Sequence, residues 1–285
     1  MTIDLDLLLK AYASGIFPMA DARDDPDTFW VEPKNRAIIP LDNFQMSRSL
    51  RKTIRSDRFR VSTDSAFADV IAICAAEAAD RKETWINAEI EEAFNDLHKL
   101  GYAHSVECWQ VDEATGEDVL VGGLYGVAIG GAFCGESMFS RVSDASKVAL
   151  AWLVARLKVG GFPLLDCQFM TDHLASLGAI EISQEAYLED LRKVRSYSPS
   201  SDSAIRSPIK SSGPLFEDGA GFAAGAGLGA GTKGVAASGT VAFGALDTLL
   251  ARLDEDARGA VGLTESSGGS SSSGKLIAQL LTQTS

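Results

Sequence analysis

Two segments of the chain place ionisable or amide side chains inside stretches that otherwise have the composition of buried β-strands. One segment, residues 133–141, contains Glu136, and the other, residues 165–168, contains Asp166 and Gln168. Because side chains alternate along a strand, Asp166 and Gln168 are expected to share one face. A buried carboxylate without a partner is costly, so these groups need either an ion pair or a catalytic purpose. Spacing alone leaves both readings open.

Positive charge is concentrated between Ser47 and Arg60, where six cations accompany one acid, Asp57. Four of the cations recur at i, i+3, i+4 and i+7, which is the spacing of one helix face. Such a stripe is ordinarily a solvated face. Here it lacks compensating acids in a chain whose net charge is −13, which favours contact with a phosphate backbone. The four are Arg48, Arg51, Lys52 and Arg55, and Arg58 follows them.

Composition and charge exclude several other classes of protein. The chain has 285 residues and no run near eighteen uninterrupted apolar residues, so no membrane span is expected. Its first residues are acidic where a signal peptide is basic, so a cytoplasmic location is expected. The four cysteines form no Cys-x-x-Cys pair and the three histidines share no metal-ligand spacing, so inert thiols, structural imidazoles and no metal are expected.

Hydrophobic periodicity predicts a compact region over residues 1–195. Apolar residues at helical spacing predict helices that begin near Leu5, Phe67 and Asn87, with Asn87 as an N-cap. The order of elements describes an α+β domain with a mixed, mostly antiparallel sheet, and it resembles that of GNAT-type N-acyltransferases. The expected strands are 103–111 and 118–129, paired as a hairpin, then 131–138 and 163–168, and further helices begin at Ser143 or Asp144 and at Asp172.

Composition changes near Arg195. Residues 196–285 hold 15 of the 27 glycines together with long serine runs. A segment of this kind buries too little apolar surface to offset the entropy of ordering it. A disordered, low-complexity tail rich in Gly, Ser and Ala is therefore predicted, with only transient helices over residues 249–253 and 276–281.

Several motifs then occur in an order that resembles the leucyl/phenylalanyl-tRNA–protein transferase family. The resemblance covers about residues 5–193, and its most specific part is the run Gly-Glu-Ser-Met-Phe-Ser-Arg at 135–141. It implies a small N-terminal domain over residues 1–40, a GNAT-type catalytic domain over residues 41–195, and no metal or organic cofactor. The matching motifs are Tyr12–Pro18, Thr84–Ile86, Gly122–Val127, Phe133–Arg141, Asp166–Gln168 and Asp172–Ala179.

The resemblance also implies an activity. Such an enzyme takes leucine, phenylalanine or, less well, methionine from aminoacyl-tRNA. It joins that amino acid to the α-amine of a protein that begins with arginine or lysine, which marks the protein for degradation. The implied partners are the acceptor arm of aminoacyl-tRNA and these acceptor proteins, with no membrane partner and a monomer as the default state.

Residue roles follow from the same resemblance. Asp166 and Gln168 match a catalytic pair that orients the attacking amine and helps to deprotonate it, and Glu136 matches a carboxylate near the acceptor. The basic helix over 48–58 matches a cluster that contacts the tRNA acceptor arm. Positions lining the pocket for the transferred side chain are matched by Leu124, Phe133, Met138 and Leu165, and an aromatic of the substrate cleft by Trp85.

Two other functions compete with this one, and three residues depart from the family pattern. An acetyl-CoA-dependent N-acetyltransferase needs a glycine-rich pyrophosphate loop that residues 140–145 lack, and a noncatalytic tRNA or N-terminus adaptor does not need the retained polar residues. Met19, Asp144 and Thr171 differ from the residues common in the family, and we expect an altered rate rather than lost activity. Truncation after Val194 is expected to change activity by no more than a few-fold.

Overall fold

The N-terminal residues form a helix and a small two-stranded sheet. In this computed structural model, which describes residues 3–76, 84–195, 197–199, 240–261 and 273–282, α1 spans Leu5–Ala13. The Asp4 side chain caps it by accepting from the Leu7 amide at 2.8 Å. Gly15, at φ +80°, lets the chain turn into β1 (Phe17–Met19), which pairs antiparallel with β2 (Phe29–Val31).

The main sheet has seven strands in the order β4-β5-β6-β7-β8-β3-β9. Its neighbouring strands pair antiparallel except β7 and β8, which are parallel and joined by α5. A mixed, mostly antiparallel sheet and the expected hairpin are therefore confirmed. The strands are β3 (Asn35–Ile38), β4 (Arg60–Thr63), β5 (Ala103–Val111), β6 (Asp118–Ile129), β7 (Ala132–Ser140), β8 (Leu164–Gln168) and β9 (Ile180–Ser183).

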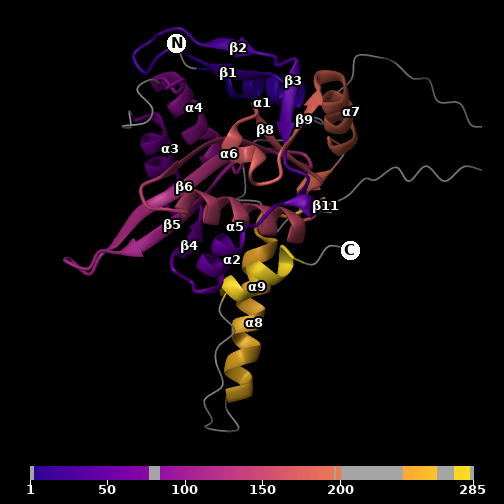
Figure 1. The fold of residues 1–285 in the computed structure, drawn as a ribbon. Helices are drawn as coiled ribbons and strands as arrows, with labels where there is room; N and C mark the ends of the chain where they lie inside the picture. Colours follow the sequence, from indigo (N-terminus) through magenta and orange to yellow (C-terminus); the bar gives the residue numbers. More distant parts are fainter. Residues whose placement is uncertain (1–2, 77–83, 196, 200–239, 262–272, 283–285) are drawn as a thin grey trace, which may run out of the picture.

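Helices cover both faces of this sheet (Figure 1). Because side chains alternate, neighbouring residues of β6 enter different cores: Leu124 packs with α2 and α5, whereas Tyr125 packs with α1, α3 and α4. The helices expected near Leu5, Phe67 and Asn87 are confirmed, and the Asn87 side chain accepts from the Ile90 amide at 2.9 Å. The helix bounds are α2 (Arg48–Arg55), α3 (Phe67–Ala75), α4 (Ala88–Lys99), α5 (Ala145–Val159), α6 (Asp172–Ala175) and α7 (Gln184–Val194), with a 3₁₀ turn at Leu41–Asn43.

Two C-terminal segments are folded where a disordered tail with transient helices over 249–253 and 276–281 was predicted. Residues 240–261 and 273–282 form β11 (Thr240–Val241), α8 (Ala245–Val261) and α9 (Ser273–Leu280), and β11 pairs with β10 (Ser198–Pro199). Phe243 and Ile277 are buried in the same core as α5. A few well-spaced apolar residues outweigh the Gly- and Ser-rich average because a ready-made core receives them. Residues 200–239 and 262–272 lie outside the described part.

Among the residues that the structure describes, no helix is both long enough and apolar enough to span a membrane.

A candidate active site where strands 7 and 8 separate

The site lies where the parallel pair of strands comes apart. The pairing of β7 with β8 runs from Ala132↔Leu164 to Cys134↔Asp166, and no later pair is recorded between them. Beyond that point β7 continues along β6, while β8 pairs on its other side with β3. Side chains that follow the last pair therefore line an opening in the sheet, and these are the motifs that contain Glu136 and Gln168.

A β-bulge aims Glu136 into this opening. Tyr125 pairs with Ser137 and Gly126 pairs with Gly135, so Glu136 is the extra residue on β7. Bulges interrupt strand alternation and redirect a side chain. Gly126 makes the bulge possible, because a Cβ there would collide with the Cys134 carbonyl oxygen and the Phe133 ring.

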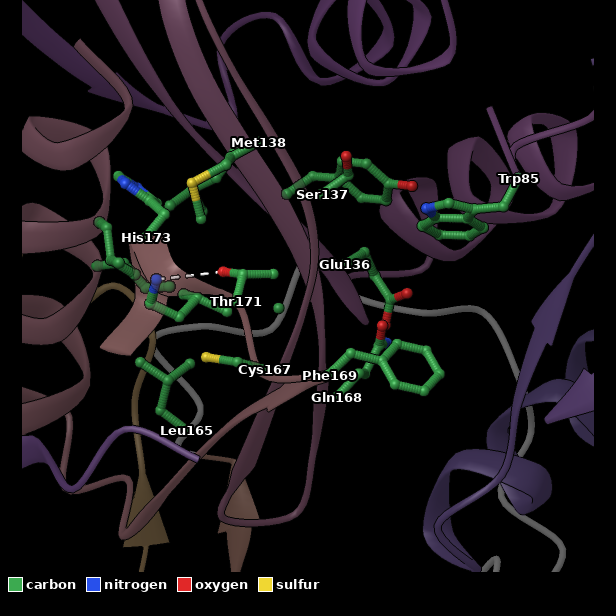
Figure 2. A pocket seen from close by; sticks show the side chains of 16 residues that line it. Trp85, Glu136, Ser137, Met138, Leu165, Cys167, Gln168, Phe169, Thr171 and His173 are labelled. Carbon is green, nitrogen blue, oxygen red and sulfur yellow. Dashed lines mark hydrogen bonds between the residues drawn. The ribbon is translucent and has the colours of Figure 1, made fainter. Parts of the chain in front are cut away.

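The opening is a cavity of about 290 Å³ with an apolar end and a polar end. Figure 2 shows Met138, Leu165 and His173 on one side of Glu136 and Trp85 on the other. Strands β6 to β8, helix α5 and the chain around α6 supply its wall. The lining residues are Trp85, Leu124, Tyr125, Gly135, Glu136, Ser137, Met138, Leu150, Leu153, Leu165, Cys167, Gln168, Phe169, Thr171, His173 and Leu174.

Glu136 carries the strongest electrostatic signal of the cavity. Its side chain is 8% exposed, and burial raises its pKa from 4.5 to about 7, although Gln168 and Tyr12 favour the ionised form. Within the described residues, neither Glu136 oxygen makes a hydrogen bond of ordinary geometry, and the same holds for the Tyr12 hydroxyl and Gln168 Nε2. Glu136, Tyr12 and Gln168 thus lie near enough to influence one another, and their polar atoms retain capacity to hydrogen-bond a ligand.

Asp166 lies behind the cavity wall and is fully buried. Its Oδ1 accepts from Arg36 Nε at 2.9 Å, and its Oδ2 accepts from Arg36 Nη2 at 2.6 Å and from the Tyr187 hydroxyl at 3.0 Å. The Arg36 guanidinium lies between the rings of Phe17 and Tyr187 and donates to the Gly15 carbonyl at 2.9 Å. Burial opposes its charge, yet Asp166 more than offsets this and raises the pKa of Arg36. The carboxylate is therefore the centre of a buried ion pair.

Asp166 also fixes the backbone of Gln168. Oδ1 of Asp166 accepts from the Gln168 amide at 2.8 Å, and Gln168 has a left-handed φ of +62°. A non-glycine residue pays for this conformation, so it persists only where neighbours enforce it. Gln168 lines the cavity and Asp166 does not. The expectation that the two side chains share one face of the strand stays a prediction.

The structure brings together most of the other predicted cavity residues. Trp85, Leu124, Met138 and Leu165 line the cavity with Glu136 and Gln168. Phe133 does not, because it is fully buried and stacks on Phe243 with ring centroids 5.5 Å apart.

The sequence analysis missed Tyr12, Arg36 and Tyr187. Tyr12 belongs to the apolar stripe of its helix, and Tyr187 lies in a segment without a motif. Arg36 did carry a signal, because it is a cation directly before the apolar run 37–39.

The remaining thiols and imidazoles mostly match the structural roles expected for them. Cys167 lines the cavity, but burial raises its pKa, so it is not an activated thiol. His98 and His104 hydrogen-bond to Ala103 and Asp64. His173 differs: it lines the cavity, and its Nε2 has no partner in the described ranges. Those ranges contain no cluster of three or more potential metal ligands.

The family departures keep recognisable local roles. The Thr171 hydroxyl caps α6 by accepting from the Leu174 amide at 3.2 Å, which an Asn side chain also does well. Asp144 precedes α5 at φ +71°, a conformation that Asp and Asn both tolerate. Met19 packs against the core around α1.

The basic stripe forms an exposed surface on α2. Leu50 and Ile54 bury one side of this helix, and the Ser47 hydroxyl caps it. The other side carries a shallow hollow of exposed cations. Arg58 follows the end of the helix and lies over the Phe59 ring. The hollow is lined by Arg48, Arg51, Lys52, Arg55 and Ser56.

Comparison with known proteins then decides the family. Residues 38–192 match the model of the leucyl/phenylalanyl-tRNA protein transferase, and residues 1–34 match that of its N-terminal domain. The chain belongs to this family. A family relative from Rhizorhabdus wittichii is 65% identical over 186 residues, which are 65% of this chain and 73% of the relative.

Two other relatives of the family differ in how much of the chain they match. One from Novosphingobium aromaticivorans is 50% identical over 281 residues, which are 98% of this chain and 96% of the relative. One from Rhodospirillum rubrum is 57% identical over 187 residues, which are 66% of this chain and 85% of the relative. All three are named leucyl/phenylalanyl-tRNA–protein transferase, so the prediction of an aminoacyltransferase is confirmed.

Proposed function

We propose that this enzyme transfers leucine, phenylalanine and, less well, methionine from aminoacyl-tRNA to proteins that begin with arginine or lysine. The product is a protein marked for degradation. The observation that carries the proposal is the single cavity that joins an apolar end to a buried carboxylate of raised pKa. The proposal includes a cytoplasmic monomer whose GNAT-type catalytic domain is built around β7, α5 and β8, after a small N-terminal domain over residues 1–40.

The apolar end suits the side chain of the donor. Met138, Leu124 and Leu165 form a wall without charge, and the flexible Met side chain adapts to ligands of different shape. One methylene changes binding in such a pocket by only about 1–3 kcal/mol, so methionine is tolerated beside leucine and phenylalanine. The imidazole of His173 borders the same space and is uncharged, because burial lowers its pKa.

The polar end suits the acceptor. An ionised Glu136 attracts the cationic side chain of an N-terminal arginine or lysine, and an acceptor that begins with alanine lacks this partner. Because the pKa of Glu136 is about 7, the carboxylate forms as the pH rises through neutrality. An incoming cation favours ionisation further.

The reaction needs positioning more than activation. The neutral α-amine attacks the ester carbonyl carbon, the new C–N bond forms, the ester C–O bond breaks, and the ribose oxygen of the tRNA leaves with a proton. An α-amine has a reference pKa of about 7.7–8.0, so roughly one in ten is already neutral at pH 7. Holding two reactants in alignment supplies about 7–11 kcal/mol in favourable cases. In our proposal Gln168 orients the amine, and Asp166 acts as a positioning residue through the backbone of Gln168.

The exposed cations of α2 suit the phosphates of the tRNA acceptor arm. We propose that Arg48, Arg51, Lys52 and Arg55 make these contacts and that Arg58 extends them. Each neutralised phosphate contributes about 0.7–0.9 to the slope of log affinity against log salt.

A transfer assay tests the proposed function. Radiolabelled leucyl-tRNA is supplied with two acceptors that differ only in an N-terminal Arg or Ala, with RNase-treated and Glu136→Ala reactions beside them. We expect label on the Arg acceptor only, and its loss in both controls. Equal labelling of the two acceptors would contradict the acceptor rule, and no labelling despite tRNA binding would replace the transferase with an adaptor.

A further inference from the structure

The C-terminal brace, residues 240–261 and 273–282, fills the core from one side. The Phe243 ring stacks on His104 with centroids 4.0 Å apart and on Phe133 at 5.5 Å, and it meets Phe162 edge-on. Phe243 is only 4% exposed. An aromatic ring held between two others in this way is a core residue of the fold.

An ion pair between a buried arginine and an exposed aspartate joins the brace to α5. Arg156, 2% exposed, donates to both carboxylate oxygens of Asp247 at 2.6 Å, to the Phe243 carbonyl at 2.8 Å and to Thr63 Oγ1 at 2.7 Å. The two-point geometry of a guanidinium with a carboxylate fixes orientation as well as distance. The start of α8 is therefore anchored to the last turn of α5.

The second helix of the brace packs directly on the basic helix (Figure 1). The Gly274 amide donates to Asp57 Oδ1 at 2.8 Å, just after the end of α2. The backbones approach so closely that a Cβ on Gly274 would collide with the Ile54 carbonyl oxygen. Ile277 is fully buried in the core that also contains Leu50 and Ile54. Helix α9 thus covers the apolar side of α2, and the exposed cations occupy the other side.

The brace differs from the rest of the chain in how it matches relatives. The family models end at residue 192. The 187 matched residues of the Rhodospirillum rubrum relative are already 85% of it, whereas the Novosphingobium aromaticivorans relative matches 98% of this chain. The brace thus lies beyond the family models, and the match to the Novosphingobium aromaticivorans relative extends over it.

We propose that the brace positions α2 and so sets the affinity for donor tRNA. The inference rests on the proposed role of the α2 cations in tRNA binding. Helix α2 has only eight residues, a length that is marginal without tertiary packing. Loss of α9 removes its cover, and the cations then lose the fixed spacing that matches a phosphate backbone.

A pair of substitutions at Asp57 tests the brace in the full chain. Asp57 has a φ of +47°, which Gly and Asn both tolerate. Asp57→Asn keeps an oxygen that accepts from Gly274, and Asp57→Gly removes it. Both remove the same negative charge, which by itself strengthens tRNA binding. We expect Asp57→Asn to bind tRNA as well as the parent or better, and Asp57→Gly to bind about threefold to tenfold more weakly, since tenfold corresponds to about 1.4 kcal/mol.

Gly274→Val provides a stronger second variant, with Gln279→Ala on the exposed side of α9 as its matched control. Affinity for leucyl-tRNA is measured over a range of salt concentrations. Transfer is also measured from adenosine that carries leucine as a ribose ester, a donor without an acceptor arm. We expect Gly274→Val to weaken tRNA binding and flatten its salt dependence while transfer from the short donor is unchanged. Equal loss with both donors would show general damage and overturn the proposal.

Arg51→Ala combined with Arg55→Ala separates this proposal from the proposed function. If the double variant binds tRNA more weakly while Asp57→Gly and Gly274→Val bind it as the parent does, the proposed role of the brace is refuted and that of α2 is kept. Unchanged binding in the double variant would refute the role of α2 and, with it, the brace.

Discussion

Glu136 is partly protonated and partly ionised near neutral pH. Burial raises its pKa to about 7, with Asp166 adding to the rise and Gln168, Tyr12 and Arg36 opposing it. Small changes in surroundings therefore decide its charge. In the proposed mechanism, a single residue thereby links acceptor preference to pH.

The pH dependence of acceptor binding follows from this pKa. As the pH rises through about 7, Glu136 ionises and the KM for an acceptor with N-terminal Arg should fall. Glu136→Gln should raise that KM and remove this component of its pH dependence, leaving the titration of the α-amine. Initial rates measured from pH 6 to 8.5 with both proteins check the prediction. An unchanged profile in Glu136→Gln would show that another group provides the negative charge.

The same pKa has a consequence for stability. The folded pKa lies above the ordinary value of 4.5, so the folded protein binds the proton more tightly than the unfolded chain does. The contribution of Glu136 to stability is therefore complete below about pH 4.5 and is lost as the pH rises through about 7. Glu136→Gln should be less sensitive to pH in this window, as measured by denaturant unfolding. A parallel pH dependence in the two proteins would contradict the raised pKa.

The buried pair of Arg36 and Asp166 predicts an asymmetry between single and double substitutions. Arg36→Met leaves a buried carboxylate without its partner and should lower the free energy of unfolding by about 3–5 kcal/mol. Arg36→Met with Asp166→Asn should recover part of this loss, because the amide is uncharged and its oxygen still accepts from the Gln168 amide. Chemical denaturation measures both. Failure of the second change to restore stability would mean that the hydrogen bonds, and not the charge, dominate.

At the scale of elements, the bulge on β7 depends on one glycine. Gly126→Ala brings a methyl group against the Cys134 carbonyl oxygen and the Phe133 ring, so the free energy of unfolding should fall by about 1–3 kcal/mol and kcat should fall with it. Gly135→Ala is a matched control in the same bulge, since its nearest atom, the Asp166 carbonyl oxygen, is 3.5 Å away. Equal stability of the two variants would show that the bulge relaxes at no cost.

Sequence patterns predicted these elements well but not the bulge within them. Helix spacing, the Asn87 cap and the hairpin turn are local signals, and each is confirmed. The left-handed backbone of Gln168 leaves no local signal, because it depends on Asp166, whose geometry Arg36 and Tyr187 fix from distant strands and helices. Position in a strand predicts a direction only while the strand remains regular.

At the scale of the whole molecule, the C-terminal brace behaves as core. Phe243→Ala should lower the free energy of unfolding by about 3–5 kcal/mol, because it removes a buried ring between two others. Leu253→Ala, in α8 but 41% exposed, should change it little. Thermal and denaturant unfolding of both variants check the contrast. Two variants of equal, parent-like stability would restore the prediction of a disordered tail.

Composition misled the sequence analysis at this scale for a physical reason. The average composition of residues 196–285 hides the few apolar residues that pack. No local sequence pattern indicates that Arg156 pairs with Asp247. Disorder is a property of a segment with nothing to bury against, and here the sheet and α5 supply that surface. The truncation after Val194, expected from composition to be tolerated, would remove Phe243 and Asp247, which pack against that surface.

The ion pair between Arg156 and Asp247 can form only late in translation, after Asp247 has been synthesised. Ribosomes deliver the chain from its N-terminus, and domains begin to fold as they emerge. All seven strands of the main sheet and α5 are complete before residue 195, yet the groups that receive Phe243 and Asp247 are still uncovered then. That apolar surface therefore stays open to solvent until α8 and α9 leave the exit tunnel. The core is therefore completed only after the ribosome has synthesised the brace.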